Sequence, residues 1–395
     1  MYSSEIGLLL LTLGTGVINS RFLGATQYGH YTFIITIVEL VTLFGGFGVA
    51  PSGARLLALS DSKDETRALL GALVCLGIGL GATVASVLAL AAPLIDILFK
   101  TELKHLIYFG AILCLNAPLT LILYRACRGT NEIGLLATIT ILPKALYLII
   151  VLVVIVFSEL SAFISLIVYF LGSLGATFFA VIKFRVRFEN LKANFVKLLS
   201  EIKSYGFNVY LGGIADNSTY KLNTLLIAAF VDTTWLGFYY IASTMVSPMA
   251  RFSTSIASSL YQGFARKTKI PSKVLIVNAV FLLVCAIGIA IIARPFISLV
   301  LTDQYLPATN LIYILIFTAL FQGLYTPVNF FLSAHGKGRE SRTISFFVSI
   351  VNLASALILI PPLGAVGAAL GSVIAKFCEL SGNVYFYKKI LSEVK

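Results

Sequence analysis

The sequence predicts an all-α integral membrane protein with twelve transmembrane helices in two lobes of six. Three observations lead to this prediction. Hydrophobic residues make up 58% of the 395 residues and charged residues only 12%, whereas a soluble domain carries about 25% charged residues. The apolar residues gather in twelve runs, each close to the ~20 residues needed to cross a bilayer. One basic amphipathic segment near the middle of the chain divides these runs into two sets of six.

The distribution of Lys and Arg supports this count of spans. Of the 29 Lys and Arg residues, 21 fall in the connections on one side of the predicted membrane and four on the other. Cytoplasmic loops carry the excess of positive charge, so both termini are expected in the cytoplasm. The predicted spans are 3–20, 30–52, 69–99, 105–125, 133–157, 160–183, 206–231, 236–262, 274–301, 306–333, 343–361 and 364–387.

The N-terminal run has no basic region before it and no cleavage site of small residues, so we expect a retained span rather than a signal peptide. It begins almost at Met1. This leaves open whether a short cytoplasmic lead-in precedes it.

The central segment predicts a three-part organisation: an N-terminal lobe (1–184), a cytoplasmic linker (185–205, here called the strap) and a C-terminal lobe (206–395). Apolar residues recur in and beside the strap at spacings of three and four, which places them on one face of a helix. These residues are Phe188, Leu191, Phe195, Leu198 and Ile202. The surrounding cations predict a helix in the membrane interface, facing anionic headgroups.

The two lobes carry matching landmarks. Gly29 follows the first span and Gly237 follows the seventh, 208 positions later, while Gly129 and Gly338 follow the fourth and tenth spans at an offset of 209. This spacing indicates a six-helix unit duplicated in parallel, and chance similarity of short glycine-containing loops is the alternative. Duplicated transporter halves enclose a substrate path at their interface.

Several motifs give the chain a recognisable resemblance. They are Arg21-Phe-Leu-Gly24-Ala-Thr-Gln-Tyr28-Gly29 after the first span, Tyr124-Arg-Ala-Cys-Arg128-Gly129, Gly206-Phe-Asn-Val-Tyr, His335-Gly-Lys-Gly338 and Pro362-Leu-Gly-Ala-Val-Gly-Ala. In their order and spacing the chain resembles the polysaccharide biosynthesis flippases, the Wzx-type O-antigen flippases of the multidrug/oligosaccharidyl-lipid/polysaccharide (MOP) transporter superfamily. The loop 265–273 is shorter than in that family.

The resemblance implies twelve helices in two lobes around a central cavity, as in the multidrug and toxin extrusion (MATE) transporters. It also implies export of undecaprenyl-pyrophosphate-linked oligosaccharide units by alternating access. The place of action would be the bacterial cytoplasmic membrane, and a polysaccharide polymerase and a chain-length regulator are the protein partners to expect. The Arg21, Gly24, Tyr28 and Gly29 motif is predicted to be architectural, because its glycines permit a tight re-entry between two spans.

Charged residues inside the spans are the candidate functional groups, because each costs roughly 2.5–3.5 kcal/mol at the bilayer centre. Cations suit a pyrophosphate through charge-assisted hydrogen bonds, and amide and aromatic groups suit a sugar path. The predicted cavity residues are Lys144, Asn217, Lys221, Asn223, Arg251, Gln322, Tyr325 and Lys376. Three alternatives stay open: polar residues that only join helices, a Lys376 that is neutralised by Glu379 or at the cytoplasmic interface, and a Lys144 that snorkels toward the cytoplasm.

No nucleotide-binding motif is visible, so ion coupling is the predicted energy source, with Glu39 or Asp216 binding H⁺ or Na⁺. For Glu39 a helix–helix hydrogen bond is the competing interpretation. The five cysteines form no CxxC and no cluster with histidine, so neither a metal site nor a cofactor is predicted. Nucleic acid is not an expected partner, since the net charge of +12 is confined to short connections.

Three other functions remain open at this stage. A MATE-like multidrug or cation antiporter would favour a cavity rich in acids. A membrane enzyme that polymerises sugars is disfavoured by the short outward loops and the isolated histidines, so the chain is predicted not to be an enzyme. The last is an inactive, scaffold-like relative.

Overall fold

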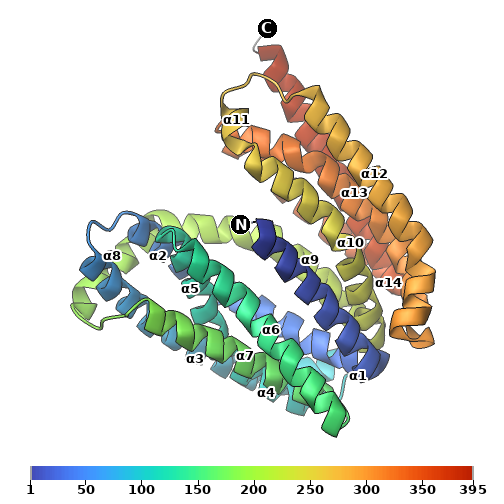
Figure 1. The fold of residues 1–395 in the computed structure, drawn as a ribbon, viewed down its shortest axis with the longest axis horizontal. Helices are drawn as coiled ribbons and strands as arrows, with labels where there is room; N and C mark the ends of the chain where they lie inside the picture. The colour runs from blue at the N-terminus through green and yellow to red at the C-terminus, as the bar shows by residue number, and fades with distance from the viewer. Residues whose placement is uncertain (1, 394–395) are drawn as a thin grey trace. The chain divides into compact units, whose positions relative to one another are not determined.

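The computed structural model describes the backbone of residues 2–393 and most of their side chains. Side chains of residues 2–6, 9, 208, 212, 213, 215–220, 262, 265, 338 and 393 are not described. Within the described residues every regular element is helical (Figure 1). Each of the twelve predicted spans coincides with helical structure, as the apolar runs require, because a backbone in lipid must satisfy its own hydrogen bonds.

Fourteen α-helices are present in the described part of the chain. Their bounds are α1 Tyr2–Phe44, α2 Val49–Ala58, α3 Lys63–Phe99, α4 Lys104–Cys114, α5 Ala117–Gly129, α6 Ile133–Phe157, α7 Ala162–Lys183, α8 Leu191–Glu201, α9 Phe207–Phe230, α10 Thr233–Ser259, α11 Tyr261–Ala265, α12 Ser272–Phe296, α13 Pro307–Ala334 and α14 Gly338–Glu393. Short π-helical turns follow α8 and α12 at Ile202–Gly206 and Ile297–Leu301, and a 3₁₀ turn covers Asp303–Tyr305.

The longest helices are each interrupted at a glycine that lies where two predicted spans meet. α1 is interrupted at Gly24, with φ 71° and ψ 171°, and α14 at Gly364, with φ 59° and ψ −137°. Glycine occupies both breaks because a side chain is disfavoured at positive φ. By length and hydropathy alone, seven helices of the described chain could cross a membrane, or eight if α2 and the bent end of α1 form one span. The protein is a multi-pass membrane protein.

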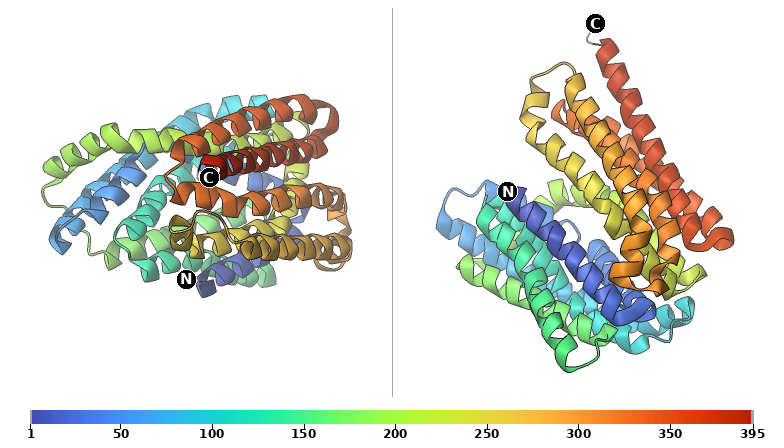
Figure 2. Two further views of the ribbon diagram at one scale, coloured as in Figure 1. Left: turned by 90° about the horizontal axis from the view of Figure 1, so that it is seen from above. Right: turned by 45° about the vertical axis from the view of Figure 1, so that its right-hand side comes forward.

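The chain forms two compact units. The N-terminal unit contains Met1–Leu23 and His30–Ile214, and the C-terminal unit contains Gly24–Gly29 and Ala215–Lys395. In the N-terminal unit α3 packs on α4 and α5, and α6 packs on α7 (Figure 2). In the C-terminal unit α13 packs against α10, α12 and α14. The three-part division drawn from the sequence stays a prediction.

The strap belongs to the N-terminal unit. Leu198 of α8 is fully buried, and Leu191, Phe195 and Ile202 pack with it on a cluster from α2, α3 and α5. Four residues of the predicted stripe therefore pack against protein, whereas Phe188 is 57% exposed. The position of this helix in the membrane interface stays a prediction.

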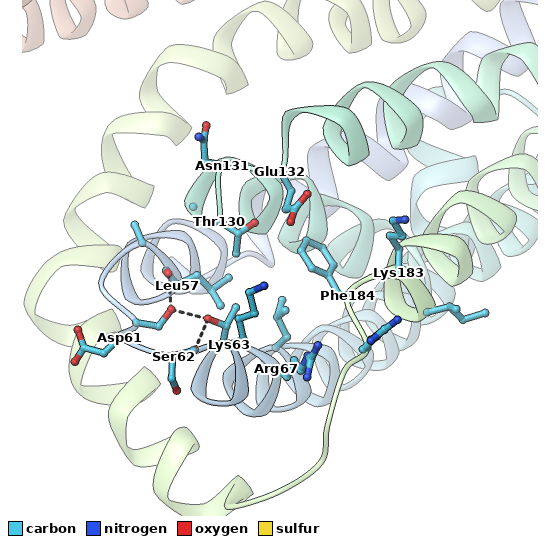
Figure 3. Close-up of a pocket in the computed structure, with 17 residues that line it drawn as sticks. Leu57, Asp61, Ser62, Lys63, Arg67, Thr130, Asn131, Glu132, Lys183 and Phe184 are labelled. Atoms are coloured by element: carbon cyan, nitrogen blue, oxygen red, sulfur yellow. Dashed lines mark hydrogen bonds between the residues drawn. The ribbon is translucent and has the colours of Figure 1, made fainter.

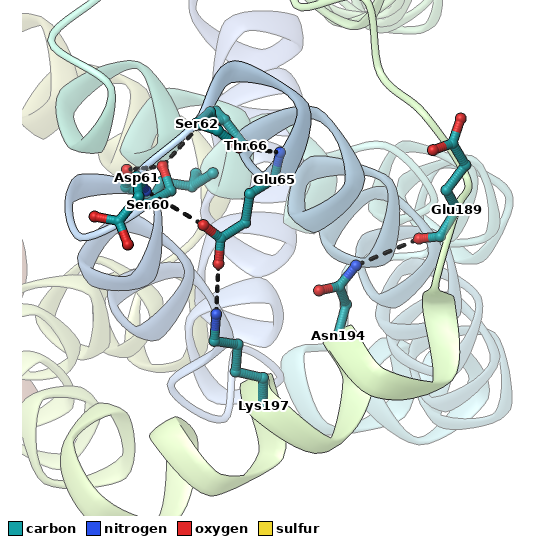
Figure 4. Close-up of polar contacts among 9 residues, drawn as sticks. Ser60, Asp61, Ser62, Glu65, Thr66, Glu189, Asn194 and Lys197 are labelled. Atoms are coloured by element: carbon teal, nitrogen blue, oxygen red, sulfur yellow. Dashed lines mark hydrogen bonds and ion pairs between the residues drawn. The ribbon is translucent and has the colours of Figure 1, made fainter.

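Backbone and charge contacts also hold the strap. The Arg187 N–H donates to the Arg67 carbonyl over 3.1 Å, and a Cβ on Gly71 would come within 2.0 Å of the Arg187 oxygen. The Lys197 ammonium lies 2.6 Å from a Glu65 carboxylate oxygen (Figure 4). The strap is thus a docked element of the N-terminal unit and not a free linker.

Candidate functional site

A buried ionic cluster lies between α13 and α14 in the C-terminal unit. The Lys376 Nζ is 2.8 Å from Oε2 of Glu379 and donates to the Tyr325 hydroxyl over 3.2 Å. The same ammonium lies 5.4 Å from the centre of the Tyr325 ring. The side chains of Lys376 and Glu379 are only 10% and 16% exposed. Glu379 therefore neutralises the charge of Lys376 inside the unit. The sequence had left this pairing open as an alternative, because the two residues are three positions apart on one helix.

Polar residues extend this cluster along the helices. The Asn383 side-chain amide donates to the Glu379 carbonyl over 2.8 Å, and Asn329 donates to Asn383 over 3.3 Å. In the same unit Asn223 of α9 donates to Asn352 of α14 over 2.9 Å, and both side chains are buried. Asn223 and Tyr325 thus contribute to helix–helix contacts in this structure, as amides and hydroxyls inside membrane bundles commonly do.

A second polar cluster lies in the N-terminal unit, where α6 faces α1. The Lys144 Nζ donates to the Thr12 hydroxyl over 2.5 Å, and the buried Tyr147 hydroxyl donates to Asn19 over 2.7 Å. Thr12 and Asn19 were not among the predicted site residues. Thr12, Thr15 and Asn19 are spaced at i, i+3 and i+7, which places them on one face of α1. This polar spacing could have identified Thr12 and Asn19 from the sequence.

The remaining predicted cavity residues differ in exposure. Arg251, in the second half of α10, is exposed, while Lys221 and Gln322 are half-buried. Of the two predicted ion-coupling residues, Glu39 is exposed on α1. Asp216 and Asn217 lie in α9, but their side chains are outside the described ones. The roles of these six residues stay predictions.

The motif after the first span packs within the C-terminal unit. Tyr28 is 1% exposed, and its ring lies 6.1 Å from that of Tyr240. A Cβ on Gly29 would come within 2.0 Å of the Thr233 carbonyl oxygen, and a Cβ on Gly237 would lie 3.2 Å from the Gly29 nitrogen. The two glycines matched by the sequence repeat therefore face each other. Arg21 is exposed, at the end of the α1 segment that precedes Gly24.

No metal-binding arrangement is evident in this geometry. Among the described residues, no group of three or more His, Cys, Asp and Glu side chains is placed to hold a metal ion. The five cysteines are free thiols. The exposed guanidinium of Arg251 is a group that suits an anion, whereas Lys376 and Glu379 neutralise each other within the unit.

Comparison with solved structures identifies the fold. The chain is similar to the lipid II flippase MurJ in an inward closed conformation, with a TM-score of 0.80 and 15% identity over 100% of this chain and 90% of that one. It is also similar to an inward-facing multidrug resistance MATE transporter of the MOP superfamily, with a TM-score of 0.74 and 13% identity over 98% and 95%. For a point mutant of the Vibrio cholerae MATE transporter VcmN, the TM-score is 0.63 at 16% identity over 99% and 96%. The predicted all-α MOP transporter fold is confirmed.

Comparison of the sequence gives the family. The curated proteins yield no match. The family model described as polysaccharide biosynthesis protein matches residues 2–266, which is more than half of the chain and includes the strap and the whole of α10. The resemblance drawn from the motifs is thereby confirmed: the chain belongs to the polysaccharide biosynthesis protein family, within the MOP superfamily fold.

Proposed function

We propose that this protein flips undecaprenyl-pyrophosphate-linked oligosaccharide units across the bacterial cytoplasmic membrane, with both termini in the cytoplasm. These units would feed the synthesis of O-antigen, capsule or exopolysaccharide. The observation that carries the proposal is the family match over residues 2–266. The similarity to a lipid II flippase supports it at the level of fold.

Arg251 is the first residue that we assign to substrate binding. It is exposed within α10, and serine and threonine residues recur along the same helix at Thr244, Ser247, Ser255 and Ser258. A guanidinium inside a predicted span is costly unless it serves a purpose, and its planar fork suits a pyrophosphate. Lys221 and Lys144 are the supporting cations. Lys376 is assigned to the buried pair with Glu379 rather than to the substrate.

Export in a deletion strain tests the proposal. The strain is complemented with wild type, Arg251→Ala or Lys221→Ala, and Lys269→Ala serves as the matched control because Lys269 is an exposed loop cation. Wild type and Lys269→Ala are expected to restore the surface polymer. The two test variants are expected to accumulate the lipid-linked unit on the cytoplasmic side of the membrane. Normal polymer in the deletion strain without complementation overturns the proposal.

Ion coupling is proposed at Asp216, with Glu39 as the second carboxylate and H⁺ or Na⁺ as the ion. A carboxylate inside a predicted span is a candidate site for a proton or ion pathway. Asp216→Asn is therefore expected to abolish export at unchanged protein level, and unchanged export in that variant removes Asp216 from the mechanism. Cooperation with a polymerase and a chain-length regulator is part of the same proposal.

A multidrug antiporter is the second candidate, favoured by the MATE transporters among the similar structures. It predicts that deletion sensitises cells to cationic dyes and leaves the surface polymer intact. The same deletion strain distinguishes the two functions, since dye sensitivity and surface polymer are measured side by side.

A further inference from the structure

A polar pocket of about 920 Å³ opens in the N-terminal unit, on the face that the Lys and Arg count assigns to the cytoplasm (Figure 3). It lies between the α2–α3 connection, the α5–α6 connection and the end of α7 where the strap begins. Charged side chains gather around it: Lys63, Arg67, Lys183 and Arg185 are the cations, and Asp61 and Glu132 are the acids. The pocket lies within one unit and is separate from the polar clusters described above.

The neighbouring acids are already engaged by cations. Asp64 contacts Arg187 at 3.0 Å and Arg67 at 3.3 Å. Glu65 contacts Lys197 at 2.6 Å. Lys63, Lys183 and Arg185 make no ion pair within the described residues. Lys63, Lys183 and Arg185 therefore line one cavity without an ion pair to a described acid, and with Arg67 the cations outnumber Asp61 and Glu132, the two acids of the lining.

The backbone holds two of these cations in place. Lys183 ends α7, and the Arg185 N–H donates to the Ile182 carbonyl over 2.9 Å. Arg185 has φ 51°, a left-handed conformation that few non-glycine residues adopt, and two residues later the strap is pinned by its backbone bond to Arg67. The turn that presents Lys183 and Arg185 is thus fixed at both ends.

The remaining lining indicates which anion fits. Leu57, Leu70, Ile182 and Phe184 contribute apolar surface to the same pocket, and α7 ends there, at the expected depth of the lipid headgroups. Basic pockets at this level bind anionic headgroups, whereas a free anion gains nothing from the apolar side. We propose that this pocket binds the phosphate of an anionic membrane lipid, with Lys63, Lys183 and Arg185 as its ligands. The proposal is independent of the transported substrate.

Lipid binding to the purified full-length protein tests this proposal. Native mass spectrometry measures the retention of phosphatidylglycerol, phosphatidylcholine and, in a separate arm, inorganic phosphate. The test variant is Lys63→Gln/Lys183→Gln/Arg185→Gln. The control is Lys267→Gln/Lys269→Gln/Lys273→Gln, which removes equal charge from exposed positions on the same predicted face. We expect phosphatidylglycerol affinity to fall at least about tenfold in the test variant and to stay unchanged in the control.

A gain of binding provides a second readout that a folding defect does not mimic. Glu132→Gln removes an acid from the pocket, so it is expected to tighten phosphatidylglycerol binding a few-fold. Equal loss in the two triple variants, equal binding of both lipids, or weaker binding in Glu132→Gln each overturns the proposal. Inorganic phosphate that binds at least as tightly as phosphatidylglycerol identifies a soluble phosphate as the occupant and overturns the assignment to a lipid.

Discussion

Two ion pairs of similar length sit in opposite surroundings in this molecule. The Lys376–Glu379 contact measures 2.8 Å, and its side chains are 10% and 16% exposed. The Glu65–Lys197 contact measures 2.6 Å, but its side chains are 34% and 52% exposed. An exposed pair contributes little, since water and salt screen it, whereas an unpartnered buried charge is strongly destabilising. Distance alone therefore does not tell which contact the fold depends on.

The comparison also separates two ways of holding an element in place. Lys376 and Glu379 pair within α14, and Lys376 reaches α13 through the Tyr325 hydroxyl, so removal of either charge leaves the other without its partner. The strap is joined to α3 by backbone proximity at Gly71 and by a buried Leu198, with ion pairs only at its surface. We expect the first region to be sensitive to charge and the second to volume.

The largest effect is predicted for single removal of a charge from the buried pair. Glu379→Leu or Lys376→Met is expected to destabilise the protein by about 3–5 kcal/mol, because the other charge is left buried without its partner. The double variant Lys376→Met/Glu379→Leu is expected to recover most of this loss. Thermal unfolding of the purified protein in one detergent measures all three, and a single variant as stable as wild type contradicts the prediction.

A smaller effect is predicted where the strap meets α3. Gly71→Ala places a Cβ against the Arg187 carbonyl, and overpacking of this kind costs about 1–3 kcal/mol. Gly79→Ala is the matched control, because it lies on the same helix and its Cβ would meet nothing within 4 Å. The readouts are the melting temperature and the rate of proteolysis within 185–205. Faster cleavage in both variants would show that Gly71 is not a specific contact.

The sequence predicted the helices far better than the contacts between them. Each of the twelve apolar runs coincides with helical structure, because the thickness of the bilayer sets the length of such runs. The possible pairing of Lys376 with Glu379 was visible, since they are three residues apart on one helix. Tyr325 was predicted as a cavity residue, but its bond to Lys376 connects positions 51 apart in sequence, and no local pattern encodes that contact. The strap shows the same limit: its apolar face was predicted and the surface that covers it was not.

The smallest effect is predicted for the exposed pair. Glu65 lies in the first turn of α3, ahead of the predicted span, and the hydrogen bond from Lys197 lowers the pKa of its carboxyl below the ordinary value of 4.5. A depressed carboxyl pKa stabilises the folded state above the unfolded value, and the contribution is lost as the pH falls through the folded pKa. A double-mutant cycle of Glu65→Gln and Lys197→Gln is expected to give about 0.2–1 kcal/mol of coupling at pH 7.

This coupling is expected to shrink as the pH falls from 4.5 towards 3, and also as salt is raised. Lys192→Gln is the control, because Lys192 is an exposed strap cation without an ion pair in the described part of the chain. Melting temperatures at each pH measure the cycle. A coupling above about 2 kcal/mol, or one that persists at about pH 3, would mean that the strap depends on its charges as α14 depends on the Lys376–Glu379 pair. A small, acid-sensitive value instead leaves Gly71 and Leu198 as the contacts that keep the strap docked.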